Sequence, residues 1–224
     1  KVLNEMHNTG VLVDVNYLNE LSKEYHEKLK KLEVKIWEMA GEEFNINSPQ
    51  QLSKIIFDKL GLKAKSMRKT STGAKSTNIS ELTKLQGMHP IIDEIISYRE
   101  LAKLVSTYID NIPGLVDSNN RLHTVFNQTG TTTGRLSSKN PNLQNLHKKT
   151  DLGMNVRKAI ISDKGFKLVS FDYSQIELRV AAIASGDEKL IKFFKEGRDI
   201  YAAVAAEVFN VEQDKVTSEM RRRA

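Results

Sequence analysis

The chain has 224 residues, with 34 lysines and arginines against 28 aspartates and glutamates and a formal net charge of +6. Its length gives room for one or two domains, and its basic balance favours an anionic partner. The chain contains no cysteine, which excludes disulfide and thiolate chemistry, and no apolar run approaches the ~18 residues that a membrane-spanning helix needs.

The first half of the chain is predicted to be helical. Asp14 is a candidate N-cap for a long helix from about Val15 to Met39, in which apolar residues recur at intervals of three and four. Ser48 followed by Pro49 predicts the start of a second helix, which Gly61 would end.

A basic segment, residues 63–78, separates these helices from two more at about Ile79–Gln86 and Ile91–Ile112. It contains no acidic residue, several serines and threonines, and five cations: Lys63, Lys65, Arg68, Lys69 and Lys75. Two interpretations are open. Either the segment is a flexible, solvated loop, or its cations and hydroxyls contact phosphates without reading base sequence.

Alternation of Leu122, Thr124 and Phe126 predicts a strand over residues 121–127, and a threonine-rich loop follows. After that loop come four residues with hydrogen-bond donors: Arg135, Asn142, Gln144 and Asn145. Donors of this kind suit the minor groove of DNA, because its A·T and G·C edges share acceptor positions. The alternative is that the amides satisfy only the backbone of a turn.

Residues 167–185 are predicted to form a strand that runs into a helix, with a carboxylate at the join. Residues 168–172 alternate in the manner of a strand, and the apolar residues that follow recur with helical spacing. Asp172 suits Mg²⁺ as a hard oxygen ligand, but Asp is also a common cap for the next helix. Further on, Asp199 is a candidate cap for a helix over residues 200–209.

Three strings in the chain resemble family A DNA polymerases, the bacterial DNA polymerase I group. All eight positions of Asp172-Tyr-Ser-Gln-Ile-Glu-Leu-Arg179 match the first palm motif of that family. The string from Phe126 to Asn145 also resembles family A, which disfavours the alternative that its amides satisfy only turn backbone. The string from Tyr98 to Tyr108 resembles the long helix of the thumb. The resemblance implies an α+β, predominantly α fold, with lead-in helices over residues 1–47 and a thumb with a basic tip over 48–116. The first part of the palm would cover 117–224 and end at the start of the fingers helix, which residues 216–224 resemble.

The resemblance also implies a DNA-templated DNA polymerase that acts in DNA replication or repair. In that family the primer 3′-hydroxyl attacks the α-phosphate of an incoming deoxynucleotide beside two Mg²⁺ ions. By resemblance, Asp172 and the backbone carbonyl of Tyr173 would bind Mg²⁺, and Glu177 would exclude a ribose 2′-hydroxyl. The partners would be primer–template DNA and dNTPs, with no membrane, and the protein would be a cytoplasmic, nucleoid-associated monomer.

Further contacts follow from the resemblance alone. Those implied with the primer and template, besides the five cations of the basic segment, are Arg135, Asn142, Gln144, Asn145, Lys103, Ser76, Thr77 and Asn78. Those implied with the dNTP, besides Glu177, are Gln175, Arg222, Lys149 and Tyr201. Two of these depart from the family pattern. Lys149 replaces an arginine and loses its bidentate fork, while Tyr201 replaces a histidine and cannot carry positive charge near pH 7.

Two other functions remain open: a non-catalytic module that grips duplex DNA, and an interaction protein whose basic segment binds another polyanion. A carboxylate beside a residue that selects the sugar favours the polymerase, because a binding module needs neither. The lysine that the family carries four residues after the position of Arg222, and its second metal-binding motif, do not occur in these residues. We therefore expect a fragment of a longer enzyme that is inactive on its own.

Overall fold

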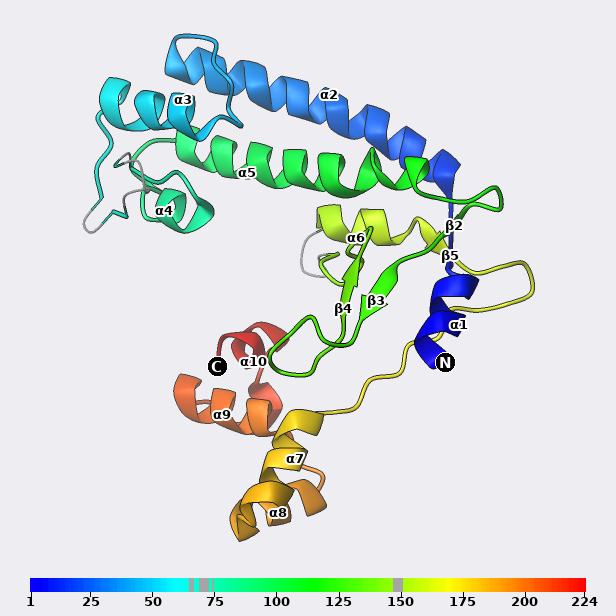
Figure 1. The fold of residues 1–224 in the computed structure, drawn as a ribbon. Helices are drawn as coiled ribbons and strands as arrows, with labels where there is room; N and C mark the ends of the chain where they lie inside the picture. Colours follow the sequence, from blue (N-terminus) through cyan, green and yellow to red (C-terminus); the bar gives the residue numbers. More distant parts are fainter. Residues whose placement is uncertain (65–66, 69–72, 74, 147–150) are drawn as a thin grey trace. The chain divides into compact units, whose positions relative to one another are not determined.

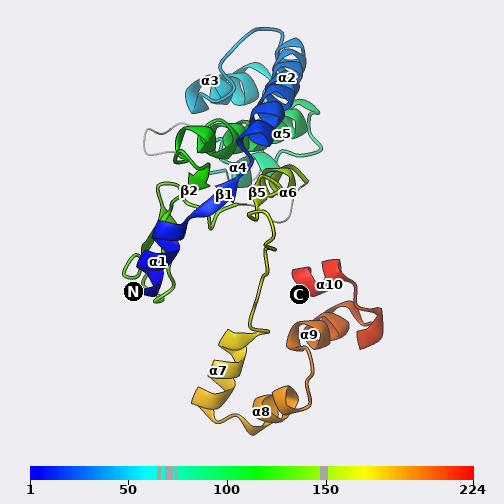
Figure 2. The same cartoon turned by 90° about the vertical axis from the view of Figure 1, so that its right-hand side faces the viewer.

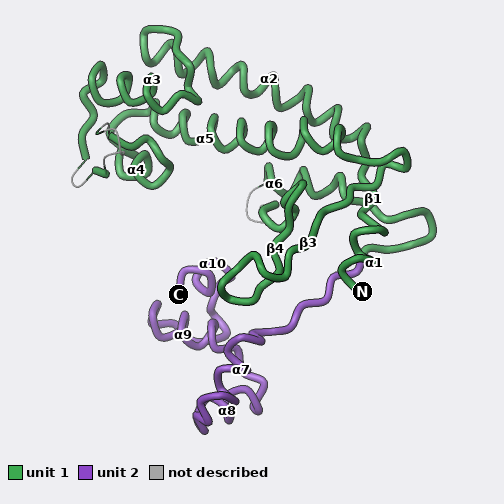
Figure 3. The backbone as a smooth tube through the Cα atoms, viewed as in Figure 1, with its two compact units in different colours: residues 1–168 green, residues 169–224 purple. Residues whose placement is uncertain are grey.

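The computed structural model describes residues 1–64, 67–68, 73, 75–146 and 151–224. It divides into two compact units, residues 1–168 and 169–224 (Figure 3). Helices dominate both units and the sheets are small, which confirms the predicted α+β, mainly α fold. The boundary between the units lies inside the segment predicted as palm, and the division into lead-in, thumb and palm remains a prediction.

Two long helices form the main layer of the first unit. α2, Val15–Ala40, begins at Asp14, whose carboxylate accepts a hydrogen bond from the backbone N–H of Tyr17 (2.9 Å). α5, Ile91–Leu104, packs along α2 and continues into a π-helical turn, Val105–Ile109, and a 3₁₀ turn, Ile112–Gly114 (Figure 1). The two helices and the cap at Asp14 agree with the prediction from sequence.

The apolar side chains of α2 and α5 contribute to two buried clusters. From these helices, the first cluster contains Leu18, Leu21, Tyr25, Leu101 and Leu104, and the second contains Ile36, Ala40, Ile91, Ile92 and Ile95. Burial of a side chain of Leu or Ile size is worth about 1.5–3 kcal/mol. The stripe of apolar residues in each helix is therefore what joins the two helices.

Shorter helices cover the second cluster (Figure 2). α3, Pro49–Ser53, begins at Ser48, whose hydroxyl accepts from the backbone N–H of Gln51 (3.4 Å). The chain then forms a π-helical turn, Lys54–Lys59, so the predicted second helix is only partly α. α4, Ile79–Thr83, begins at Asn78.

Short strands complete the first unit together with α1, Val2–Thr9, and α6, Asp151–Arg157. β1, Val11–Val13, lies between β2, Arg121–Leu122, and β5, Ile160–Ile161, in an antiparallel sheet of order β2-β1-β5. β3, Val125–Asn127, pairs antiparallel with β4, Ser137–Lys139. The single strand predicted over residues 121–127 is interrupted at His123 and Thr124, and the Thr124 hydroxyl donates to the carbonyl oxygen of Pro141 (2.7 Å).

The second unit is built from helices and turns. It contains α7, Ile176–Ser185; α8, Glu188–Lys195; α9, Ile200–Phe209; a 3₁₀ turn, Gln213–Lys215; and α10, Ser218–Arg223. The carboxylate of Asp199 caps α9, as predicted, and that of Asp187 caps α8.

The strand predicted over residues 168–172 does not form. No described residue pairs with this segment, and Phe171 is 93% exposed. A strand needs a neighbouring strand for its backbone N–H and C=O groups, and apolar alternation alone does not supply one. The apolar stripe of α7 is exposed in the same way at Ile176, Val180 and Ile183, while Ala182 is buried.

A histidine ties α1 to the strands of the first unit. Nδ1 of His123 is 2.7 Å from the backbone oxygen of His7, and Nε2 is 3.2 Å from the Asp117 carboxylate. Both partners can only accept, so the protonated ring satisfies the two contacts at once. The bond to His7 and then the bond to Asp117 raise the pKa of His123, against opposing effects of burial and of Arg121. Gly10, with φ of +60°, allows this approach, because a Cβ there would lie 2.8 Å from Nδ1 of the ring.

We predict that His123→Gln changes the pH dependence of stability. The pKa of His123 is raised in the folded state above its ordinary value of 6.5. Its stabilising effect is therefore complete below that value and is lost as the pH rises through the raised pKa. Urea denaturation of both proteins between pH 5 and 9 should show the largest difference in unfolding free energy at the acidic end. A difference that is constant with pH would contradict the assignment.

Candidate functional site

Asp172 is exposed in the irregular segment that leads through a turn at residues 174–175 into α7, and we call residues 172–175 the carboxylate turn. The N-cap residue of α7 is Gln175, so the alternative that Asp172 caps this helix is wrong. The carboxylate of Asp172 and the neighbouring carbonyl of Tyr173 are oxygen donors, the type that Mg²⁺ takes. Among the described residues, no group of three or more His, Asp or Glu side chains could hold a metal ion. Asp172 therefore fits Mg²⁺ as one carboxylate of a larger set.

Gln175 connects this turn to α9. Its side-chain N–H donates to Asp199 Oδ1 (3.3 Å), and its side-chain oxygen accepts from the backbone N–H of Ile200 (3.2 Å). The backbone of Gln175 has φ of +54°, the left-handed region that non-glycine residues rarely adopt. The two bonds from its amide oppose the cost of that conformation and fix the start of α7 beside the start of α9.

Asp199 also connects α9 to α10. Its Oδ1 accepts from the backbone N–H groups of Tyr201 (2.9 Å) and Ala202 (3.2 Å), and its Oδ2 accepts from Nε of Arg221 (2.8 Å). Partial burial pushes the pKa of Asp199 upward, but the bonds from Arg221 and from the backbone together outweigh it and lower the pKa. The guanidinium of Arg221 also lies 5.2 Å from the centre of the Tyr201 ring, within range of a cation–π contact.

Arg221 is a residue that sequence reasoning missed. The resemblance pointed to Arg222, which is exposed in the same turn of α10. Three consecutive arginines give no signal of which one faces α9, because its partners, Asp199 and Tyr201, lie about 20 residues earlier in the chain. Glu177, in the first turn of α7, is exposed, five residues after Asp172.

The residues with donors for the minor groove lie in the first unit. Arg135 and Asn145 are exposed. The side-chain oxygen of Asn142 accepts from the backbone N–H of Gln144 (3.0 Å), and the amide nitrogen of Gln144 donates to the carbonyl of Leu136 (3.0 Å). These two amides therefore do satisfy turn backbone, as the alternative interpretation held, and their contacts with DNA remain predictions.

The described part of the basic segment is only partly solvated. Lys63 and Arg68 are exposed, whereas the ammonium of Lys75 lies 4.7 Å from the centre of the Phe57 ring. Thr77 is 4% exposed, which leaves too little of its surface for a contact with a phosphate. Three of the implied contacts lie outside the described residues: Lys65, Lys69 and Lys149.

A buried carboxylate anchors this segment to α4. Glu81 is 1% exposed, and its carboxylate accepts from the ammonium of Lys84 (2.9 and 3.0 Å) and from the backbone N–H of Arg68 (3.1 Å). The bond from Lys84 chiefly, with help from Arg68, lowers the pKa of Glu81 against the effect of burial. Of the other implied contacts here, Asn78 caps α4 with its side-chain oxygen, Ser76 is half-buried, and Lys103 is exposed on α5.

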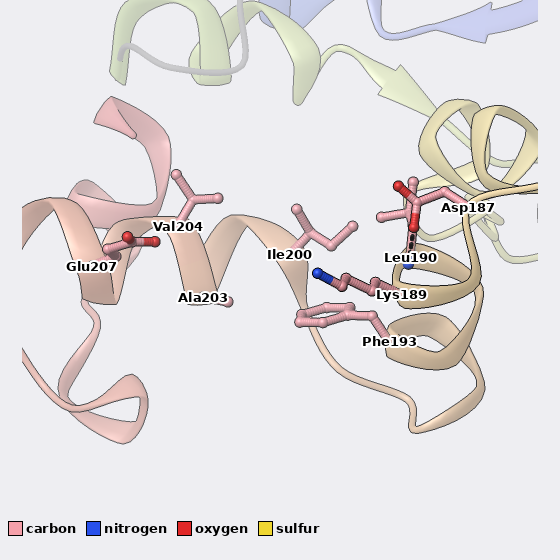
Figure 4. A pocket seen from close by; sticks show the side chains of 8 residues that line it. All are labelled: Asp187, Lys189, Leu190, Phe193, Ile200, Ala203, Val204 and Glu207. Carbon is pink, nitrogen blue, oxygen red and sulfur yellow. Dashed lines mark hydrogen bonds between the residues drawn. The ribbon is translucent and has the colours of Figure 1, made fainter. Parts of the chain in front are cut away.

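A groove of about 350 Å³ lies between α8 and α9 in the second unit (Figure 4). Its lining is mainly apolar, with Leu190, Phe193, Ile200 and Val204, and also includes Lys189. Asp172 and Glu177 do not line it. The groove is therefore separate from the carboxylate turn.

The comparisons with known proteins agree with these features. The model of DNA polymerase family A matches residues 15–224. The chain is 51% identical to "DNA polymerase I, thermostable" from Thermus aquaticus over 225 residues, 100% of this chain and 27% of that relative. It is 48% identical to DNA polymerase I from Bacillus subtilis (strain 168) over 225 residues, 100% of this chain and 25% of that relative.

A solved structure is similar as well. The POL domain of Pol1 from M. smegmatis, in a complex with DNA primer-template and dNTP, matches with a TM-score of 0.86 and 36% sequence identity. The match covers 99% of this chain and 39% of that one.

The fold, the exposed carboxylate turn and these matches together indicate a protein of the nucleic-acid polymerase class. The chain belongs to DNA polymerase family A, which confirms the resemblance found in the three sequence strings. It spans about a quarter of the length of the two relatives named above. No helix in the described part of the chain is long and apolar enough to cross a membrane.

We predict that replacing Lys63 and Arg68 together by glutamine weakens binding of the full-length protein to duplex DNA, to a similar extent for different sequences. Each phosphate contact that the substitutions remove should reduce the slope of log K against log salt by about 0.9. Fluorescence anisotropy at four salt concentrations measures the slope. Lys23→Gln, in a lysine of α2 that lies outside the basic segment, is the control. An unchanged slope would favour the solvated-loop interpretation.

Proposed function

We propose that the protein to which these residues belong is a DNA-templated DNA polymerase that extends a primer 3′ end with dNTPs, in DNA replication or repair. The observation that carries the proposal is Asp172. It is exposed, it does not cap α7, and it opens an eight-residue string that matches the family motif throughout. The similarity to a polymerase domain in a complex with primer-template and dNTP supports the same partners.

The catalytic role that we propose for Asp172 is to hold Mg²⁺ by its charge, together with the carbonyl oxygen of Tyr173. A pair of such ions, when bound, stabilises the attacking and leaving oxygens in phosphoryl transfer. Asp172 suits this role because its carboxylate is exposed and takes no part in capping α7. A further carboxylate would come from the rest of the full-length protein, and we expect residues 1–224 alone to be inactive.

For the dNTP, we propose that Glu177 occupies the space that a ribose 2′-hydroxyl would need. Its position in the first turn of α7 places it one turn from the segment that carries Asp172. Gln175, Tyr201 and Arg222 remain proposed contacts of the nucleotide. Lys149 is a proposed contact of the nucleotide by resemblance alone. Arg221 joins them, because the structure holds it against the ring of Tyr201.

For the DNA, we propose contacts from two exposed regions of the first unit. The donors after β3, Arg135, Asn142, Gln144 and Asn145, would meet the minor groove, where shared acceptors allow contact at any sequence. The basic segment would meet phosphates, with Ser76, Asn78 and Lys103 nearby in the chain or on α5. We propose a monomer that works at the nucleoid in the cytoplasm, where its template lies.

Asp172→Asn in the full-length protein should remove most nucleotidyl transfer and leave primer–template binding nearly intact. The amide keeps the shape of the carboxylate and loses the charge that holds Mg²⁺. Primer extension measures the first effect and a DNA-binding titration the second. Asp214→Asn, in the 3₁₀ turn of the same unit, is the control. Turnover within about tenfold of wild type, roughly 1.4 kcal/mol of barrier, would contradict the assignment and favour a non-catalytic DNA-binding module.

Glu177→Ala should let ribonucleotides in, because it removes the obstruction to the 2′-hydroxyl. The measurement is the ratio of incorporation efficiencies, kcat/KM, for a deoxynucleotide and the matching ribonucleotide. Glu188→Ala is a matched control, since Glu188 is the acidic residue in the first turn of α8. If the ratio does not change, Glu177 has a packing or electrostatic role only.

A further inference from the structure

The network around Asp199 has features that capping alone does not require. A cap needs one side-chain oxygen to accept from the first backbone N–H groups of its helix. Oδ1 of Asp199 does this for α9, and it also accepts from Gln175. Oδ2 is left for a different partner, Nε of Arg221 on α10. One carboxylate thus joins the starts of α7 and α9 to the last turn of α10.

The geometry of the Arg221 contact matters, because an arginine has five N–H donors in a planar fork. The printed bond to Asp199 uses Nε (2.8 Å), and the guanidinium carbon lies 5.2 Å from the centre of the Tyr201 ring. A guanidinium held through Nε and close to the ring has its two Nη groups oriented before any ligand arrives. Two parallel Nη–H donors are the arrangement that matches the oxygens of a phosphate group.

Gln175 extends the network toward the carboxylate turn. It lies three residues after Asp172, and its amide bonds both Asp199 and the backbone of Ile200. A shift of Asp199 would therefore disturb the turn that carries Asp172 as well as Arg221. The three side chains form one continuous path within the second unit, from the turn to the guanidinium.

We propose that Asp199 is a positioning residue that orients Arg221 for the phosphate groups of an incoming nucleoside triphosphate, and that Gln175 couples this orientation to the turn of Asp172. The proposal rests on the proposed polymerase function and adds Asp199, a residue with no proposed contact of its own with the substrate. Tyr201 serves in it as a neutral platform for the guanidinium, a role that suits a tyrosine in place of a charged side chain.

A purely electrostatic role and a positioning role predict opposite changes in the Kd for dNTP when Asp199 is replaced by Asn. If Asp199 acted only through its charge, its removal would favour an anionic ligand and lower the Kd for dNTP. If it orients Arg221, its removal frees the guanidinium and raises the Kd. Asn caps a helix about as well as Asp, so the variant keeps α9 and changes chiefly the contact with Arg221.

The test uses the full-length protein on a primer that ends in a dideoxynucleotide, with Ca²⁺ in place of Mg²⁺, so that dNTP binds without extension. We expect Asp199→Asn to raise the Kd of the matched dNTP about threefold to tenfold, the effect of losing an oriented, partly exposed charged pair. With Mg²⁺ and an extendable primer, KM should rise by a similar factor.

Asp187→Asn is the matched control. Asp187 caps α8 through Oδ1, which accepts from the backbone N–H of Leu190 (3.0 Å), as Figure 4 shows. Its substitution changes the same kind of cap in the same unit without touching Arg221. The Kd for dNTP should stay within about twofold of wild type. Thermal unfolding of both variants checks that the second unit is intact.

A second pair of variants tests the path itself. Arg221→Lys removes Nε and the fork, so adding Asp199→Asn to it should raise the Kd little further, because both changes interrupt one interaction. Gln175→Asn keeps an amide and a residue that tolerates positive φ, but it is one methylene too short to hold Asp199. It should lower kcat by about tenfold, more than it raises KM.

The outcomes separate the proposals. The positioning role would be overturned by an unchanged or lower Kd in Asp199→Asn. It would also be overturned if the effects of Asp199→Asn and Arg221→Lys on the Kd simply add. In either case, primer extension by the wild type would still uphold the polymerase function. A wild-type protein that neither extends a primer nor binds dNTP would overturn both. Loss of dNTP binding in Asp187→Asn to the same degree would show that the effect belongs to helix capping, and it would also overturn the proposal.

Discussion

The packing of α2 against α5 is the interaction on which the first unit depends. Each buried cluster draws side chains from both helices, with the fully buried Tyr25 in one and Ile92 in the other. The other elements of the unit, including α3, α4 and the small sheets, add to a surface that these two helices provide. The basic segment and the string around Arg135 are thus held by the same scaffold, and any DNA contacts they make depend on it.

Local chemistry was predictable from the sequence because it involves neighbours in the chain. The caps at Asp14, Ser48 and Asp199 follow from a single side chain and the backbone two or three residues on. The strand predicted over residues 168–172 was wrong. A strand needs a partner strand, and alternation of apolar residues does not show whether one is present. At the break between β2 and β3, the Thr124 hydroxyl bonds the carbonyl of Pro141, and local alternation gives no sign of a partner 17 residues away.

The same distinction between neighbours in the chain and distant partners applies to the candidate site. The eight-residue string predicted roles for Asp172 and Glu177, and the family that it indicated is confirmed, while the two roles remain predictions. The contact of Arg221 with Asp199 joins residues 22 positions apart, and no periodicity marks it. The burial of Thr77 is also a tertiary fact, since a threonine in a hydrophilic segment is usually exposed. Residue types in the sequence therefore indicated which side chains could act in the site, and only the tertiary packing showed which residues they contact.

The buried carboxylate of Glu81 makes one part of the molecule conditional on acidity. The link between α4 and the backbone of Arg68 needs Glu81 in its ionised form to hold Lys84 as well, and its lowered pKa keeps it ionised through the ordinary carboxyl range. In strongly acidic solution the carboxylate gains a proton and this link weakens, while the apolar side chains of α2 and α5 in the two clusters carry no carboxylate to protonate. Acid would thus release the basic segment from α4 while the packing of α2 against α5 persists, a local opening that precedes global unfolding.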